Sequence, residues 1–200
     1  YPEPFLNRKT PLFFEKWMEN YFATYINCDI RRLFPRLNTH VFQRFVKMIS
    51  ATSSKLTNYA DFSKSLDVSQ PTIKSYFDII EGTFIWRRLS SFEGNVKKRL
   101  IKMPKGHLRD SGLLCYLSNI QSIDALLSHP QFGFIWEGFI IEELINLLSF
   151  SNQRVFFYHF RTQHKAEIDL VVEINNTFIP IEIKTGRSIK KNQLFTLKEF

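Results

Sequence analysis

Three polar residues near the carboxyl end of the chain have the types and spacing of a phosphodiester-hydrolysing site. Asp169 lies in one apolar run, and Glu182 and Lys184 lie in the next as Glu-Ile-Lys. Mg²⁺ takes oxygen ligands from one or two carboxylates together with water and phosphate. A nearby lysine can orient a water or stabilise charge that develops on phosphorus. One interpretation of the pattern makes Asp169 and Glu182 ligands of Mg²⁺ or Mn²⁺, with catalytic roles for both and for Lys184.

Residues 167–174 and the apolar run after the Asn-Asn pair predict two antiparallel strands. The Asn-Asn pair suits a two-residue turn that needs positive φ. This turn sets the register, in which Asp169 lies directly opposite Glu182. Because strand side chains alternate between faces, Ile168 and Leu170 are expected on an aliphatic face and the carboxylates on the other.

Two explanations fit this acidic face. Facing carboxylates repel each other across a sheet, and a hard cation between Asp169 and Glu182 would remove the repulsion. Alternatively, the face is a solvated surface on which Glu167 and Lys184, opposite each other in the same register, form an ion pair. The two strands alone leave both explanations open.

A helix predicted over residues 134–150 adds a further carboxylate. Glu137 falls at the centre of its apolar stripe, whereas Glu142 and Glu143 fall toward the other side and are expected in solvent. A buried carboxylate needs a partner, which a metal ion, an arginine or a backbone donor would supply. If the partner is a metal ion, Glu137 is a further candidate catalytic residue.

The preceding segment predicts a winged helix over residues 39–118. A short helix, a turn and a helix capped by Ser69 have the helix-turn-helix layout, and residues 84–92 and 96–103 predict a basic β-hairpin after them. Winged helices contact DNA or dock onto proteins, and both uses stay open. The predicted nucleic-acid contacts are basic residues of the second helix and the wing: Lys74, Arg87, Arg88, Lys97, Lys98, Arg99 and Lys102.

The charge distribution favours a nucleic-acid partner for the wing more than for the acidic strands. The formal net charge is +8, and the segment from Phe84 to Arg109 carries eight Lys or Arg against one acidic residue. Residues 133–200 carry eight charges of each sign and are neutral. A basic segment of this kind meets phosphate backbones or serves as a solubilising surface.

Composition excludes several classes of protein. Hydrophobic residues make up 44% and charged residues 23% of the chain, as in globular proteins. Its apolar runs are shorter than the ~18 residues of a membrane span, so we expect no membrane partner. Cys28 and Cys115 lack metal-binding spacing, which predicts a reducing, cytoplasmic location and no structural zinc. The chain contains no GxxxxGK phosphate-binding loop.

The order of helix, strands and hairpin around these residues resembles the PD-(D/E)XK nuclease superfamily. The matching residues are Glu137, Asp169 and the segment Glu182-Ile183-Lys184. The resemblance implies an αβββα domain within an α+β or α/β protein. It also implies the Ile183 carbonyl as a further metal ligand and a second metal or metal-bound water beside Glu137.

Other segments are similar to a domain of unknown function found C-terminal to AAA-type ATPase domains in bacteria and archaea. They read YPEPFLNRK, YINCDI, MPKGHLRDSGLLCYL, WEGFIIEEL, AEIDLVVE and IPIEIKTG. The resemblance implies that an ATPase domain, which would bind ATP, precedes this chain in a longer protein and is a partner of it. Two functions are consistent with these residues. One is a metal-dependent nuclease with DNA as substrate, and the other is a non-catalytic module that binds DNA or protein. A purely structural role leaves the acidic residues unexplained.

The expected organisation has four parts. Residues 1–38 form a helical segment at the end of the ATPase region, and residues 39–118 form the winged helix. Residues 119–132 form a linker, and residues 133–200 form the nuclease-like domain without its final strand.

Overall fold

The computed structural model describes residues 11–92, 103–162, 167–186 and 197, which form helices and one six-stranded sheet. The first helices are α2 (Pro11–Thr24), the π-helical η1 (Tyr25–Ile30), α3 (Arg31–Leu33), α4 (Thr39–Ser50), α5 (Tyr59–Leu66) and α6 (Gln70–Gly82). Later helices are α8 (Ser111–Leu117), α9 (Ile123–Ser128) and α10 (Phe132–Ser149). The strands are β1 (Lys55–Leu56), β2 (Trp86–Ser91), β3 (Lys105–Leu108), β4 (Val155–Arg161), β5 (Glu167–Ile174) and β6 (Thr177–Ile181). The predicted mixture of α and β structure is confirmed.

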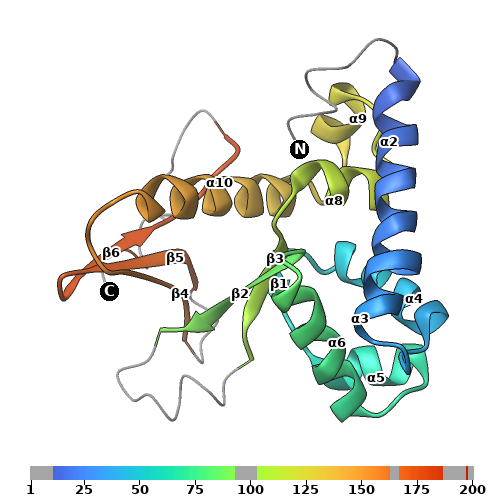
Figure 1. Cartoon of the computed structure of the whole chain (residues 1–200). Helices are drawn as coiled ribbons and strands as arrows, with labels where there is room; N and C mark the ends of the chain where they lie inside the picture. Colours follow the sequence, from blue (N-terminus) through green and yellow to red (C-terminus); the bar gives the residue numbers. More distant parts are fainter. Residues whose placement is uncertain (1–10, 93–102, 163–166, 187–196, 198–200) are drawn as a thin grey trace.

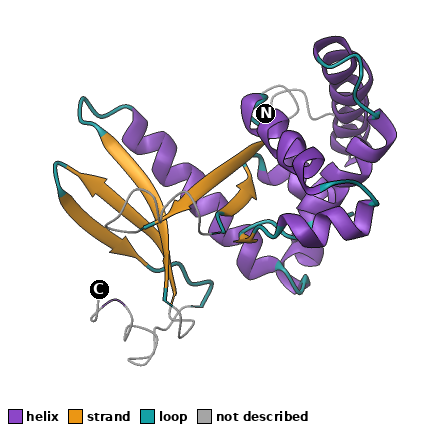
Figure 2. Ribbon diagram, turned by 90° about the horizontal axis from the view of Figure 1, so that it is seen from below, coloured by secondary structure: helices purple, strands orange, loops and turns teal. Residues whose placement is uncertain are grey.

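Strand β2 links the two halves of the sheet, whose order is β1-β3-β2-β4-β5-β6. Its first part pairs antiparallel with β3, and its last residues, Ser90 and Ser91, pair parallel with β4. Figure 1 shows the helices α2 to α6 on one side of this link and the strands β4 to β6 on the other. Figure 2 shows α10 alongside the sheet, and its Ile141 and Ile145 pack with Leu170 and Val172 of β5.

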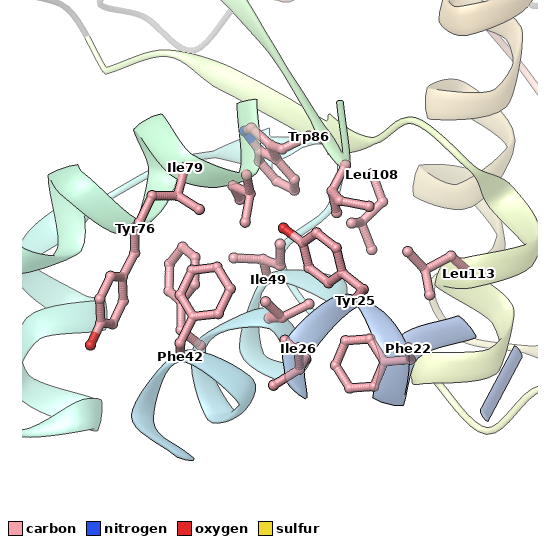
Figure 3. Packing of buried hydrophobic residues seen from close by; sticks show 14 of the residues in the cluster. Phe22, Tyr25, Ile26, Phe42, Ile49, Tyr76, Ile79, Trp86, Leu108 and Leu113 are labelled. Atoms are coloured by element: carbon pink, nitrogen blue, oxygen red, sulfur yellow. The ribbon is translucent and has the colours of Figure 1, made fainter. Parts of the chain in front are cut away.

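The larger core lies among the amino-terminal helices, β2, β3 and α8. Side chains from these elements converge around Tyr25, whose hydroxyl is 2.8 Å from the Thr83 hydroxyl (Figure 3). Helix α6 contributes Tyr76 and Ile79, and β2 contributes the buried ring of Trp86. This core fixes β2 and β3 in position, and with them the side chains that reach toward α10.

The predicted helix-turn-helix elements are present, but the strand that follows them pairs differently from the prediction. Ser69 caps α6 by accepting a hydrogen bond from the Thr72 N–H. The antiparallel partner of β2 among the described residues is the strand at residues 105–108, whereas the predicted return strand covers residues 96–103. Residues 93–102 lie outside the described residues, so the predicted tip of the wing is not described.

Helix α10 is apolar on most of its surface yet buries two glutamates, Glu137 and Glu142. No helix among the described residues has the combination of length and apolar sequence needed to cross a membrane.

Candidate active site

The hairpin β5–β6 has the predicted register. It pairs Ile174 with Thr177 beside the turn and Leu170 with Ile181 at the far end. Both asparagines of the turn have positive φ, 50° and 63°, as a two-residue hairpin turn of this type requires. Strand β6 ends directly before Glu182, so the Glu-Ile-Lys segment follows the strand instead of forming its last residues.

A backbone hydrogen bond holds this segment against β5. The Ile183 N–H donates to Asp169 Oδ2 at 2.8 Å, and the Lys184 ammonium forms an ion pair with Glu182. The three residues of the predicted motif are therefore near one another at the end of the hairpin.

A β-bulge turns the acidic side chains of β5 toward α10. Between Tyr158 and Phe160, β4 advances by two residues while β5 advances by three. The extra residue interrupts the alternation of β5, so Ile168 packs with Tyr158 whereas Leu170 packs against α10. The prediction that these two residues share a face is wrong, because simple alternation does not allow for an extra residue. Asp169 consequently shares the α10 side of the sheet.

A buried lysine on β3 is the cationic partner of the acidic side chains. The Nζ atom of Lys105 lies 2.7 Å from Glu137 Oε1, 2.7 Å from Glu167 Oε1 and 3.7 Å from Asp169 Oδ1. Its side chain is only 4% exposed. Arg161 adds a second cation at 3.3 Å from Glu167. We call Lys105, Glu137, Glu167 and Asp169 the Lys105 cluster.

Lys105 was not among the predicted site residues. The need of Glu137 for a partner was predicted, but a lysine distant in the sequence supplies it in place of an arginine or a backbone donor. The predicted ion pair between Glu167 and Lys184 is wrong, because Glu167 pairs with Lys105 and Arg161 and Lys184 pairs with Glu182. The sequence indicates only that the buried Glu137 carboxylate needs a partner, and it does not identify Lys105 as that partner.

Burial and neighbouring charges set the protonation of the Lys105 cluster. Burial raises the pKa of Glu137 to about 7; the Lys105 charge opposes this rise and the Asp169 charge adds to it. Burial acts to lower the pKa of Lys105, but the charges of Glu137 and Glu167 outweigh it and raise that pKa above its ordinary value. Lys105 is therefore a cation at neutral pH, while Glu137 exchanges its proton near neutrality.

Glu137, Asp169 and Lys184 line a hollow of about 250 Å³, and Glu182 adjoins it through its ion pair with Lys184. Burial raises the pKa of Glu182, with the Lys184 hydrogen bond opposing and the Asp169 charge adding to the rise. Burial acts to lower the pKa of Lys184, but the hydrogen bond and charge of Glu182 and the charge of Asp169 raise it overall. Glu182 Oε2 is buried without a hydrogen-bond partner among the described residues.

The residues present fit a divalent cation at Asp169 and Glu182. The unpartnered Glu182 oxygen is a hard donor left unsatisfied beside a second carboxylate, and Mg²⁺ needs only one or two protein carboxylates with water and phosphate. Within the part of the chain that the structure describes, no group of three His, Cys, Asp or Glu side chains surrounds a common metal position. Asp169 and Glu182 would hold such an ion with two protein carboxylates.

A second buried cluster ties α10 to β2 and β3. Glu142 Oε1 is 2.9 Å from His107 Nε2, and Glu142 Oε2 accepts from Arg87 at 3.1 Å and from Arg109 at 3.2 Å. The prediction of a solvated Glu142 is wrong, because β2 and β3 cover that side of the helix with cations. The absence of a side chain at Gly138 permits the approach of β3, since a Cβ there would lie 3.3 Å from His107 Cβ and 2.9 Å from Ser54 Oγ.

The basic residues predicted to contact nucleic acid lie in different surroundings. Lys74 is exposed on α6, whereas Arg87 is bound to Glu142 and Arg88 forms ion pairs with Asp78 and Glu81. The remaining four, which are Lys97, Lys98, Arg99 and Lys102, lie outside the described residues.

Comparison with known proteins places the chain in a family. Residues 1–124 match the family described as domain of unknown function DUF8612. The chain belongs to this family. Residues 132–200 match a second one, described as domain of unknown function DUF4143. The predicted resemblance is confirmed in its coarser form, a chain built of domains of unknown function. Lys105 lies in the DUF8612 region, and its three carboxylate partners lie in the DUF4143 region.

Two curated relatives are similar to most of this DUF8612 chain. One is an uncharacterized protein of Mycobacterium bovis and the other an uncharacterized protein of Mycobacterium tuberculosis. Each is 34% identical over 168 residues, which cover 84% of this chain and 37% of the relative. The chain thus spans a little over a third of the length of these relatives. No solved structure matches it.

Proposed function

We propose that the DUF4143 region is a PD-(D/E)XK nuclease-like unit that hydrolyses phosphodiesters with a divalent cation, in a longer protein that also carries an AAA-type ATPase domain. The observation that supports it most is the hydrogen bond from the Ile183 N–H to Asp169, which holds the Glu-Ile-Lys segment beside Asp169 at a hollow that Glu137, Asp169 and Lys184 line. Asp169 and Glu182 would hold the cation. When bound, the cation would activate a water and stabilise charge on the phosphate.

The side chains around the hollow would have distinct roles. Because its pKa is raised, Lys184 remains an ammonium at neutral pH and would stabilise negative charge on the phosphate rather than remove a proton from water. Glu137, with a pKa of about 7, is the carboxyl that can take up or release a proton in the working pH range.

DNA is the proposed substrate, and the helix-turn-helix, which we propose belongs to a winged helix, is the proposed contact. Gln70, Lys74 and Ser75 are exposed at the start of α6, where such helices approach DNA. Replacing one phosphate-contacting lysine weakens binding and lowers the slope of affinity against salt by about one. We expect both effects for Lys74→Ala with a labelled duplex, and neither for Lys16→Ala on α2; equal affinities of the two variants would refute the contact.

The Lys105 cluster favours a second function, a non-catalytic module that binds DNA or protein and regulates the ATPase. A lysine that already lies within 3.7 Å of three carboxylates can hold α10 in place without any metal. Arg87 and Arg88 are likewise engaged in ion pairs with carboxylates of this chain.

Calorimetric titration with Mn²⁺ distinguishes the two functions. The nuclease proposal predicts binding by the wild-type protein, loss of binding in Asp169→Asn, and unchanged binding in Glu173→Gln, a control on the same strand. It also predicts that supercoiled plasmid is nicked by the wild type and not by Asp169→Asn. No Mn²⁺ binding, or binding that survives in Asp169→Asn, would refute the proposed cation site and favour the non-catalytic module.

A further inference from the structure

Lys105 joins the acidic site to a strand of the other family region. Its strand β3 is bonded to β2 and carried by the amino-terminal core, so the lysine is fixed from outside the β5–β6 hairpin. The ammonium is in close contact with Glu137 and Glu167 and sits at the longer distance of 3.7 Å from Asp169 Oδ1. The other carboxylate oxygen of Asp169 is taken by the Ile183 N–H. Oδ1, the oxygen of Asp169 that a divalent cation would use, therefore faces the lysine.

We infer that Lys105 is a built-in counter-cation that competes with the divalent cation for Asp169 and so sets the metal affinity of the site. The inference rests on the proposed function, because it assigns a role to Lys105 only if Asp169 binds a cation. Lys105 is a positioning residue here and does not touch the substrate.

Charge and geometry together imply competition. A divalent cation bound at Asp169 would lie within a few ångströms of a buried ammonium, and like charges at that separation repel strongly in a protein interior. The lysine cannot leave for solvent freely, because its side chain is almost fully covered and its strand is paired on both sides. Since Glu137 and Glu167 are its closer partners, the ammonium can remain with them while it lowers the affinity of Asp169 for a second cation.

The test measures Mn²⁺ affinity in a lysine variant with a matched control. We expect Lys105→Met to bind Mn²⁺ about tenfold more tightly than the wild type, because a repelling charge is removed. Lys47→Met, the same substitution at an exposed position of α4, should bind as the wild type does. Asp169→Asn combined with Lys105→Met should lose the binding, which ties the gained affinity to Asp169.

The possible outcomes separate the inference from the proposed function. Tighter binding in Lys105→Met alone supports the inference. Equal or weaker binding in Lys105→Met, with Asp169-dependent binding in the wild type, overturns the inference and leaves the cation site intact. No Asp169-dependent binding in any variant overturns both.

A measurement on the wild-type protein covers the case in which Lys105→Met does not fold. The buried ammonium should give its own lysine side-chain nitrogen resonance, assigned as the signal missing from Lys105→Arg. Mg²⁺ should shift this resonance over the same concentration range in which it binds. An unshifted Lys105 resonance in a protein saturated with Mg²⁺ would overturn the inference.

Discussion

Neutralising Glu142 should destabilise the fold strongly, whereas neutralising its neighbour Glu143 should not. Glu142 is 4% exposed and touches His107, Arg87 and Arg109. Burial acts to raise its pKa, but the hydrogen bonds of His107 and Arg87 and their charges lower it from the ordinary 4.5 to about 2. At about 1.36 kcal/mol for each unit, this lowering corresponds to about 3 kcal/mol of stability at neutral pH.

Glu142→Gln is the perturbation that removes the charge with little change of shape. Loss of one partner from a buried ion cluster also leaves its cations uncompensated, which typically costs about 3–5 kcal/mol. The free energy of unfolding at pH 7, measured by urea denaturation, should therefore fall by about 3 kcal/mol. Glu143→Gln, one residue away and exposed, should change it by less than about 0.5 kcal/mol.

The pH dependence tests the same reasoning independently. A carboxyl whose pKa is lowered in the folded protein contributes stability that is complete above 4.5 and is lost as the pH falls through about 2. The difference between the wild type and Glu142→Gln should accordingly be present above pH 4.5 and shrink toward pH 2. Equal stabilities of the two glutamine variants at pH 7, or a difference that grows on acidification, would refute the assignment.

Three further predictions concern other parts of the molecule. Because burial raises the pKa of Glu137 to about 7, the folded protein holds one more proton than the unfolded chain between pH 4.5 and 7. As the pH rises over that range, the free energy of unfolding relative to that of Glu137→Gln, measured by urea titration, should fall by up to about 3 kcal/mol. An increase in this free energy with rising pH would contradict the assignment of the raised pKa to burial. Gly106→Ala should lower the melting temperature, since the added Cβ would lie 2.5 Å from the indole ring of Trp86 and overpacking typically costs about 1–3 kcal/mol. The control Gly82→Ala should leave the melting temperature unchanged, because there is open space around that position. A thiol reagent should label the exposed Cys28 before the half-buried Cys115, whose pKa is raised by burial; equal rates, followed by mass spectrometry, would show that the burial is wrong.

The sequence predicts correctly those features that depend on residues close together in the chain, such as helix caps and tight turns. Ser69 caps α6 as expected, and the Asn-Asn turn alone sets the register of β5 and β6. Asp169 and Glu182 are close enough for the Asp169 charge to raise the pKa of Glu182 because this register is local. For the same reason, the Glu-Ile-Lys segment could be placed beside Asp169 without knowledge of the remaining fold.

Contacts between distant segments are not predictable in this way. Lys105 and Glu142 find their partners across β3 and α10, and no periodicity within either element indicates which cation meets which carboxylate. The bulge that redirects Asp169 depends on the pairing of β4 with β5, since one strand alone alternates regularly. The apolar pattern of α10 also led to the wrong prediction for Glu142. A helix that is covered on two sides has no single polar face, so its sequence does not show whether Glu142 is exposed or buried.

The parallel pairing of β2 with β4 has a consequence for how the chain folds. It joins Ser90 to Tyr158, so a long loop must close before the two halves of the sheet meet, and such closure slows folding more than local contacts do. The helical core needs no part of β4 to β6 and can form while the ribosome still holds the later strands. The last strands then add beside β2, and Lys105 on the neighbouring strand β3 gains Glu167 and Asp169 as partners at that stage. The hollow that Glu137 and Asp169 line is thus completed only after β5 has joined the sheet.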